Sequence, residues 1–135
     1  MVKRDKSSYE GLQKDIRRIK APKIEVWRNE YADKDYVVTL EHPEFTCVCP
    51  KTGLPDFANI VIQYRPDRWC VELKSFKMYL LFYRNMGVFH EHVVNKILDD
   101  FVNACKPKWV YIKGEFGIRG GIKTTVSAEY QRSQS

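Results

Sequence analysis

The segment that most constrains the fold of this 135-residue chain is EHVVNKILDDFVNACK, residues 91 to 106. Its apolar residues come in adjacent pairs, and successive pairs follow one another at intervals of three or four positions. This spacing keeps one face of a helix apolar for about four turns. Pro107 follows directly and ends the helix, because proline has no N–H to donate. The chain is therefore expected to fold around a helix that is buried along one side.

Segments rich in β-branched and aromatic residues lie on both sides of this helix and predict strands. They are residues 24–30, 36–42, 58–64, 69–73, 108–116 and 122–130. A second helix is expected over residues 74–85, where apolar residues also recur at helical spacing. Because no βαβ unit repeats, this order predicts an α+β fold, with an antiparallel sheet of about four strands and both helices on one face. The other face or the edges of that sheet would then need a partner chain.

The positive charge of the chain is concentrated near its N-terminus. The net charge is +6, and residues 1–23 hold eight Lys and Arg against three Asp and Glu. We therefore expect a basic, mobile arm over residues 1–23 and a single domain over 24–135. No apolar run is long enough for a membrane span and no secretory signal is evident, so the expected compartment is the cytoplasm. There the four cysteines are expected to be reduced thiols.

The stretch FTCVCPKTGLPDF, residues 45–57, is expected to form one loop with a cysteine and an aspartate on its two sides. Cys49 and Asp56 meet only if the chain doubles back, and Gly53 with its neighbouring prolines favours such a turn. A cysteine in this turn, with Lys51 nearby to favour the thiolate, is a candidate nucleophile. On composition alone, a small residue in a tight turn is an equal alternative.

Other polar residues suit binding. Glu91 either stabilises a helix N-terminus or, with His90 beside it, accepts two parallel hydrogen bonds from a guanine-like edge. Lys74 and Lys77 share one helical face and Arg119 precedes two glycines, so these cations lie either in solvent or on the phosphates of a dinucleotide. No GxGxxG motif follows a strand, which argues against a Rossmann site. The cysteine and histidine spacing lacks the second pair of a zinc site, and no metal is expected.

Four motifs together resemble the QueF family, the NADPH-dependent 7-cyano-7-deazaguanine reductases of queuosine biosynthesis. They are CPKTGLPDF (49–57), ELKSFKMY (72–79), FHE (89–91) and RGG (119–121). The resemblance covers about residues 24–130 and suits the short, single-module form of the family. It implies the tunnelling fold, in which sheets of several subunits join into barrels. It also implies a homodecamer of two stacked pentamers, with active sites between subunits.

The resemblance further implies the chemistry. Cys49 adds to the nitrile carbon of 7-cyano-7-deazaguanine to form a covalent thioimide, and Asp56 supplies a proton to the nitrogen. Two NADPH then give 7-aminomethyl-7-deazaguanine.

The resemblance also assigns binding residues. The positions that bind the base correspond to Val71, Glu72, Leu73, His90 and Glu91. The positions expected to bind the phosphates of NADPH are Lys74, Lys77 and Arg119. Cys47 receives no role.

Two other functions stay open at this point. An archaeal QueF-like amidinotransferase, which acts on the nitrile already present in tRNA, has some support from the basic arm. A non-enzymatic, basic RNA-binding module is the alternative from another class. The intact motif at residues 72–79 favours a cofactor-using reductase, so a nucleic-acid partner is not expected.

Overall fold

The structure is a computed structural model that describes residues 16–133. Its elements are η2 (Ile16–Arg18), β1 (Val26–Arg28), β2 (Val38–Val48), β3 (Pro55–Arg65), β4 (Trp69–Val71), α1 (Leu73–Leu81), η3 (Phe82–Asn85), α2 (His90–Cys105), β5 (Trp109–Phe116) and β6 (Thr125–Gln131). The strands β2, β3, β5 and β6 form a four-stranded antiparallel sheet in that order, and β1 pairs with β4 in a small second sheet.

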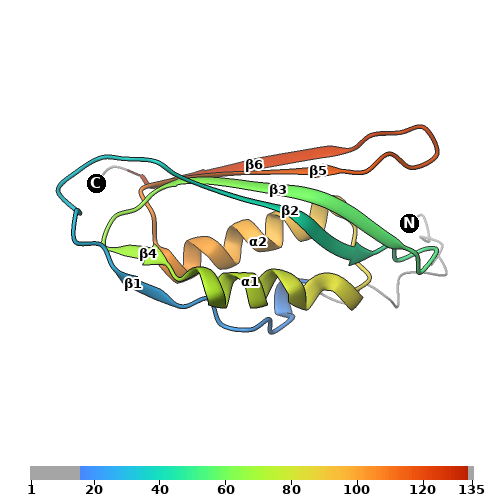
Figure 1. Ribbon diagram of the computed structural model, residues 1–135, viewed down its shortest axis with the longest axis horizontal. Helices are drawn as coiled ribbons and strands as arrows, with labels where there is room; N and C mark the ends of the chain where they lie inside the picture. The colour runs from blue at the N-terminus through green and yellow to red at the C-terminus, as the bar shows by residue number, and fades with distance from the viewer. Residues whose placement is uncertain (1–15, 134–135) are drawn as a thin grey trace, which may run out of the picture.

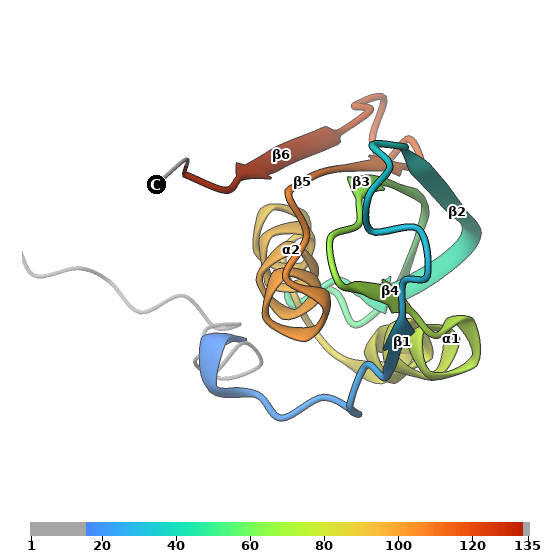
Figure 2. The same cartoon turned by 90° about the vertical axis from the view of Figure 1, so that its left-hand side faces the viewer.

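Both helices lie on one face of the four-stranded sheet (Figure 1). In the end-on view of Figure 2, α2 lies beneath β5 and β6, whereas α1 lies toward β2, beside the small sheet. This arrangement confirms the predicted α+β fold, with an antiparallel sheet and two helices on one of its faces. The first and fourth predicted strands are separate from the main sheet and form the β1–β4 pair.

The two faces of the main sheet differ in chemistry because burial alternates along its strands. On β5, Val110, Ile112 and Phe116 point toward the helices and are buried. The opposite face carries paired polar groups, among them Lys113 Nζ and Glu115 Oε1, which lie 3.0 Å apart. That face can meet water by itself, so the edge strands β2 and β6 are where the sheet lacks partners.

The prediction of a single loop over residues 45–57 was wrong for much of its length. β2 continues past Pro43 to Val48 because a register irregularity between His42 and Phe45 accommodates the proline. Cys47 then pairs opposite Asp56, and Val48 opposite Pro55. Only residues 49–54 form the turn.

The predicted basic arm, residues 1–23, is only partly within the described range, because residues 1–15 lie outside it. In the part that is described, Ile16 and Ala21 are partly buried against the core, and η2 contacts α2. No helix within residues 16–133 is long and apolar enough to cross a membrane.

Candidate active site

The turn between β2 and β3 places Cys49 at one end of the molecule. The N–H of Cys49 donates to the carbonyl of Leu54 at 2.8 Å, and the N–H of Gly53 donates to the carbonyl of Cys49 at 2.9 Å. Gly53 has φ +73°, a conformation that side chains other than glycine's rarely allow. The turn predicted from Gly53 is therefore present, closed by two backbone hydrogen bonds.

This turn favours the thiolate of Cys49. A hydrogen bond from the Thr52 side chain is the main cause that lowers the pKa of the Cys49 thiol, and the backbone N–H groups of Thr52 and Lys51 act in the same direction. Partial burial and the negative charge of Asp56 oppose them. Lys51 thus contributes through its backbone. The neighbouring Cys47 differs, because burial raises the pKa of its thiol to about 12.

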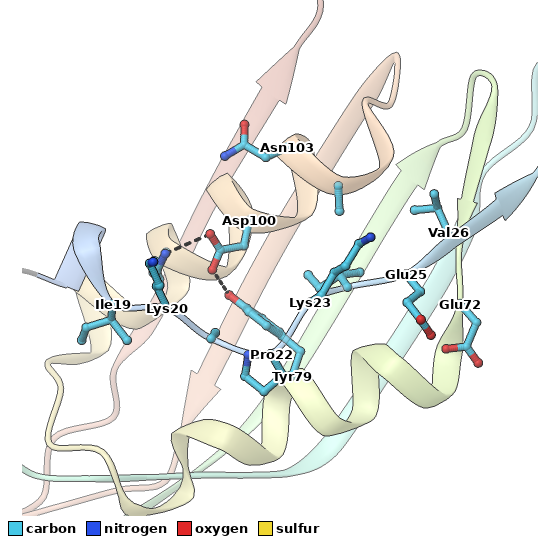
Figure 3. A pocket seen from close by; sticks show the side chains of 14 residues that line it. Ile19, Lys20, Pro22, Lys23, Glu25, Val26, Glu72, Tyr79, Asp100 and Asn103 are labelled. Atoms are coloured by element: carbon cyan, nitrogen blue, oxygen red, sulfur yellow. Dashed lines mark hydrogen bonds and ion pairs between the residues drawn. The ribbon is translucent and has the colours of Figure 1, made fainter.

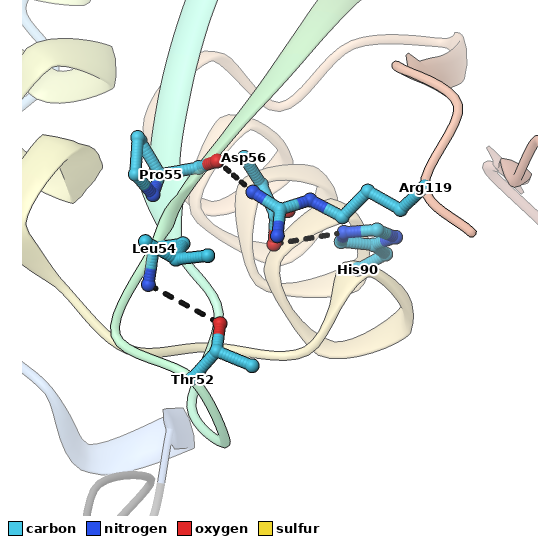
Figure 4. Close-up of polar contacts among 6 residues, drawn as sticks. All are labelled: Thr52, Leu54, Pro55, Asp56, His90 and Arg119. Atoms are coloured by element: carbon cyan, nitrogen blue, oxygen red, sulfur yellow. Dashed lines mark hydrogen bonds and ion pairs between the residues drawn. The ribbon is translucent and has the colours of Figure 1, made fainter.

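Asp56 is a buried carboxylate with two nitrogen partners (Figure 4). Its side chain is 5% exposed; its Oδ1 lies 2.5 Å from Arg119 Nε and its Oδ2 lies 3.1 Å from His90 Nε2. Arg119 also donates from a terminal nitrogen to the carbonyl of Pro55. A buried carboxylate is strongly unfavourable unless it is paired, and these contacts provide the pairing.

Backbone contacts bring His90 to this carboxylate. Val48, the last residue of β2, accepts a hydrogen bond from the N–H of Val88 at 3.0 Å and donates one to Met86 at 3.0 Å. The segment before α2 is therefore tied to the end of β2, so α2 begins at His90 beside the start of β3. The His90 ring stacks on Phe116, with ring centroids 3.8 Å apart and planes 9° apart.

The hairpin between β5 and β6 positions Arg119. Arg119 and Ile122 exchange both backbone hydrogen bonds, at 3.0 and 2.9 Å, around Gly120 and Gly121. Both glycines have positive φ, +55° and +79°, as a two-residue hairpin turn requires. The N–H of Gly117 donates to the carbonyl of Phe57 at 2.9 Å, so the base of the hairpin is fixed to β3 next to Asp56.

The other predicted site residues divide into two groups. Glu91 is exposed in the first turn of α2, directly after His90. Val71, Glu72 and Leu73 lie where β4 meets α1, at the opposite end of α1 from the Cys49 turn (Figure 1). A single chain therefore brings Cys49, Asp56, His90 and Arg119 to one end and keeps residues 71–73 away from them.

Comparison with known proteins decides the family. A sequence model described as "QueF-like protein" matches residues 55–135. The chain is 56% identical over 113 residues to a protein of Elusimicrobium minutum named NADPH-dependent 7-cyano-7-deazaguanine reductase, covering 84% of this chain and 85% of that protein. It is 52% identical over 111 residues to a protein of Chlorobaculum tepidum with the same name, covering 82% and 95%. The chain belongs to the QueF family.

The fold agrees with this membership. The crystal structure of the archaeosine synthase QueF-Like in the apo form matches this QueF-family chain with a TM-score of 0.66. The match covers 73% of this chain and 96% of that one, at 22% sequence identity. At this identity the likeness shows a common fold only.

Glu72 has a structural role in this QueF-family chain. It caps α1, accepting hydrogen bonds from the N–H groups of Ser75 at 2.6 Å and Lys74 at 3.1 Å. These hydrogen bonds lower the pKa of the Glu72 carboxyl, and the bond from the Ser75 N–H has the largest effect. Its carboxylate is thus held in place and ionised at neutral pH.

Glu72 also lines a hollow of about 800 Å³ between residues 19–26 and the two helices (Figure 3). Asp100 lies in this hollow and accepts hydrogen bonds from Tyr79 at 2.5 Å and Lys96 at 2.9 Å. The hollow does not include Cys49 or Asp56. It therefore lies apart from the cysteine and its acid.

Lys74 and Lys77 are exposed on α1. Lys77 borders a second hollow of about 300 Å³, lined mainly by apolar side chains of β2, β3 and α1. An exposed ammonium group beside an apolar hollow, as at Lys77, suits a ligand that combines a phosphate with a ring. Within residues 16–133, no cluster of three His, Cys, Asp or Glu side chains is arranged to hold a metal ion.

The sequence interpretation missed two residues of this site, Thr52 and Phe116. Thr52 had a usable signal, because a hydroxyl three positions after Cys49 in the same turn can reach back to the sulfur. Phe116 had none, since its contact with His90 depends on how β5 and α2 pack together.

Proposed function

We propose that this QueF-family chain is an NADPH-dependent reductase that converts 7-cyano-7-deazaguanine to 7-aminomethyl-7-deazaguanine, consuming two NADPH, in cytoplasmic queuosine biosynthesis. The observation that carries the proposal is the Cys49 turn. There, hydrogen bonds lower the pKa of the Cys49 thiol, and the strand that follows the turn carries, near its start, the buried carboxylate of Asp56. The chain as a whole is 56% identical to a reductase of that name. A cysteine that merely fills a tight turn does not need these donors.

The first step in this proposal is covalent addition. The Cys49 thiolate attacks the nitrile carbon, a sulfur–carbon bond forms, and one π bond of the nitrile becomes an N–H bond. Asp56 would accept the thiol proton as the Cys49 thiolate forms and then deliver that same proton to the nitrile nitrogen, so the proton lost by sulfur ends on the product and the addition needs no outside acid. A positioned acid of this kind accelerates a step by roughly 10²- to 10⁴-fold. The product of the addition is a thioimide.

The remaining steps need a hydride source. When bound, NADPH would supply the two hydrides that take the thioimide carbon to the amine level. Lys74 and Lys77 would hold its phosphates, since both are exposed cations on α1 and Lys77 borders the smaller hollow. Cys49 must leave as a thiolate before the amine forms, and the donors in its turn favour that departure.

Recognition of the base is proposed to use two copies of the chain. His90 and Glu91 would bind one edge of the deazaguanine, and Val71, Glu72 and Leu73 of a neighbouring copy would bind the rest. Large apolar side chains are exposed around the Cys49 end, including Leu54 at 56%, Phe57 at 62% and Ile118 at 69%. Such a patch is typical of an interface, and β2 and β6 are open edges. We propose a homodecamer of two pentamers.

Mixing two inactive variants tests the shared site. Cys49→Ala and Glu72→Ala are each expected to abolish turnover. If every site takes Cys49 from one copy and Glu72 from its neighbour, random mixing restores both residues at about a quarter of the interfaces. Activity should therefore return after co-expression of the two variants. No recovery in co-assembled oligomers would contradict a site formed between copies.

NADPH oxidation tests the function itself. The purified protein is mixed with NADPH, with and without 7-cyano-7-deazaguanine, and the loss of NADPH absorbance is compared with the amine formed. Two NADPH lost for each nitrile, and none with Cys49→Ala, is the expected result. Adduct formation at Cys49 without NADPH oxidation would point instead to amidination of the nitrile in tRNA, as in a QueF-like amidinotransferase.

A further inference from the structure

Arg119 contacts the proposed acid directly, although its motif suggested a ligand for cofactor phosphates. Its Nε lies 2.5 Å from Asp56 Oδ1, and a terminal nitrogen of the same guanidinium donates to the carbonyl of Pro55. Pro55 and Asp56 are consecutive, so one planar group joins the Asp56 carboxylate to the backbone just before it. This arrangement fixes the rotation of the carboxylate as well as neutralising its charge.

The backbone of the hairpin determines where Arg119 lies. The reciprocal hydrogen bonds between Arg119 and Ile122 hold the turn, and the contact from Gly117 to Phe57 holds its base against β3. Arg119 is therefore presented next to Asp56 by regular structure, and its side chain is 39% exposed. A long side chain that only extended into solvent would not need a hairpin to hold it in one position.

The burial of Asp56 argues against the idea that Arg119 serves only to bind cofactor phosphates. If Arg119 moved to a phosphate, the carboxylate, at 5% side-chain exposure, would keep only its contact with His90 Nε2 at 3.1 Å. Loss of one partner from a buried charged pair is strongly unfavourable. Lys74 and Lys77, which are exposed on α1, do not face this cost if they bind phosphates.

We infer that Arg119 is a positioning residue for Asp56, which it holds in the orientation for proton transfer to the nitrile nitrogen. The inference rests on the proposed function, and it places the effect of Arg119 in the addition step, before any cofactor is needed. A residue that binds only NADPH phosphates would act later. The two roles can therefore be separated by omitting NADPH.

The test measures the rate at which Cys49 forms its adduct with 7-cyano-7-deazaguanine in the absence of NADPH, by rapid quenching and mass spectrometry. Arg119→Gln should slow this rate by roughly 10- to 100-fold, the size of effect expected when a catalytic group is misplaced by about 1 Å. Arg119→Lys should recover part of the rate, because an ammonium can pair with Asp56 but does not have the planar fork that also reaches Pro55.

Lys123→Gln is the matched control. Lys123 is a cation on the same hairpin, is 58% exposed, and lies 3.8 Å from Glu115. Its replacement removes the same charge and should leave the adduct rate unchanged. Melting temperature and oligomer size, measured for every variant, show whether each one folds and assembles like the wild type.

Each outcome has one meaning. A wild-type adduct rate in folded Arg119→Gln, with only the KM for NADPH raised, would overturn the positioning role and leave the proposed function intact. Absence of an adduct in the wild type would overturn both, since there would then be no addition step in which Asp56 could protonate the nitrile nitrogen. An equal loss of rate in Lys123→Gln would show a general effect of charge and would also overturn the inference.

Discussion

Gly114 offers the sharpest test of how packing supports the site. It lies on β5 and faces α2, and a Cβ added there would be 2.8 Å from Val94 Cγ2, 3.1 Å from Phe116 Cε2 and 3.3 Å from Ile60 Cδ1. The three neighbours are at most 2% exposed. Because carbon atoms do not approach to 2.8 Å without a shift, Gly114→Ala must push α2 away from the sheet or turn the Val94 side chain, and its 3.1 Å contact also presses on the Phe116 ring.

The expected cost follows from these contacts. Overpacking of a buried site costs about 1–3 kcal/mol, and the lower chain entropy of unfolded alanine offsets about 0.4–1 kcal/mol of it. A net loss of about 1–2 kcal/mol in a chain of this size corresponds to a melting temperature about 4–7 °C lower. Phe116 stacks on His90, so adduct formation at Cys49 should slow as well.

Thermal melting at one fixed protein concentration measures this prediction, because the stability of an oligomer depends on concentration. Val94→Ala alone should destabilise through the methyl groups it removes, yet it opens space for the new Cβ. The double variant should therefore be more stable than the sum of the single effects predicts, by about 1 kcal/mol.

Gly117→Ala is the matched control for this cycle. Its nearest neighbour would be the Phe57 carbonyl oxygen at 3.7 Å, an ordinary contact, so it should be nearly neutral. The reasoning would be refuted if Gly114→Ala melted like the wild type, or if the two single effects added without coupling.

Three further predictions concern the chemistry. Thr52→Val removes the hydroxyl that lowers the pKa of Cys49, so the rise of Cys49 alkylation with pH should move to higher pH. Thr52→Ser keeps a hydroxyl and should keep the wild-type profile. An unchanged profile in Thr52→Val would show that the Thr52 hydroxyl does not lower the pKa of Cys49. Asp56→Asn should bind the base but slow reduction by roughly 10²- to 10⁴-fold, measured as single-turnover product formation, and an unchanged rate would remove Asp56 from the proton path. Lys77→Gln should raise the KM for NADPH several-fold and leave the adduct rate without NADPH unaffected, which steady-state and adduct assays decide together.

Local patterns in the sequence predicted the parts of the fold that depend on neighbours along the chain. The apolar pairs of residues 91–106 and the proline that follows them were enough to predict a helix, and α2 spans His90–Cys105. Gly53 likewise indicated a turn next to Cys49, and its φ is positive.

Contacts between distant segments were beyond this reasoning. The predicted strand over residues 36–42 stopped before Pro43, but pairing with β3 carries β2 past this proline through a register irregularity. Arg119 was expected to bind cofactor phosphates, and its contact with Asp56 was not foreseen because its partners, Pro55 and Asp56, lie more than sixty positions earlier. The family resemblance supplied candidate roles for these residues, yet the pairing of Arg119 with Asp56 depends on the hairpin and on where β3 begins.

The division of residues between the two ends of α1 explains why the chain would need a second copy. Cys49 and Asp56 could together carry out the proposed addition wherever the nitrile reaches them, because Cys49 lies in the turn and Asp56 in the first residues of β3 of the same chain. Holding a flat base and a dinucleotide would require surfaces on several sides, and Glu72 caps the end of α1 that lies away from that turn. A neighbouring copy that covered the exposed Leu54 and Phe57 would bury apolar surface, and it would at the same time bring the remaining binding residues next to Cys49. Assembly and recognition would then depend on the same contacts.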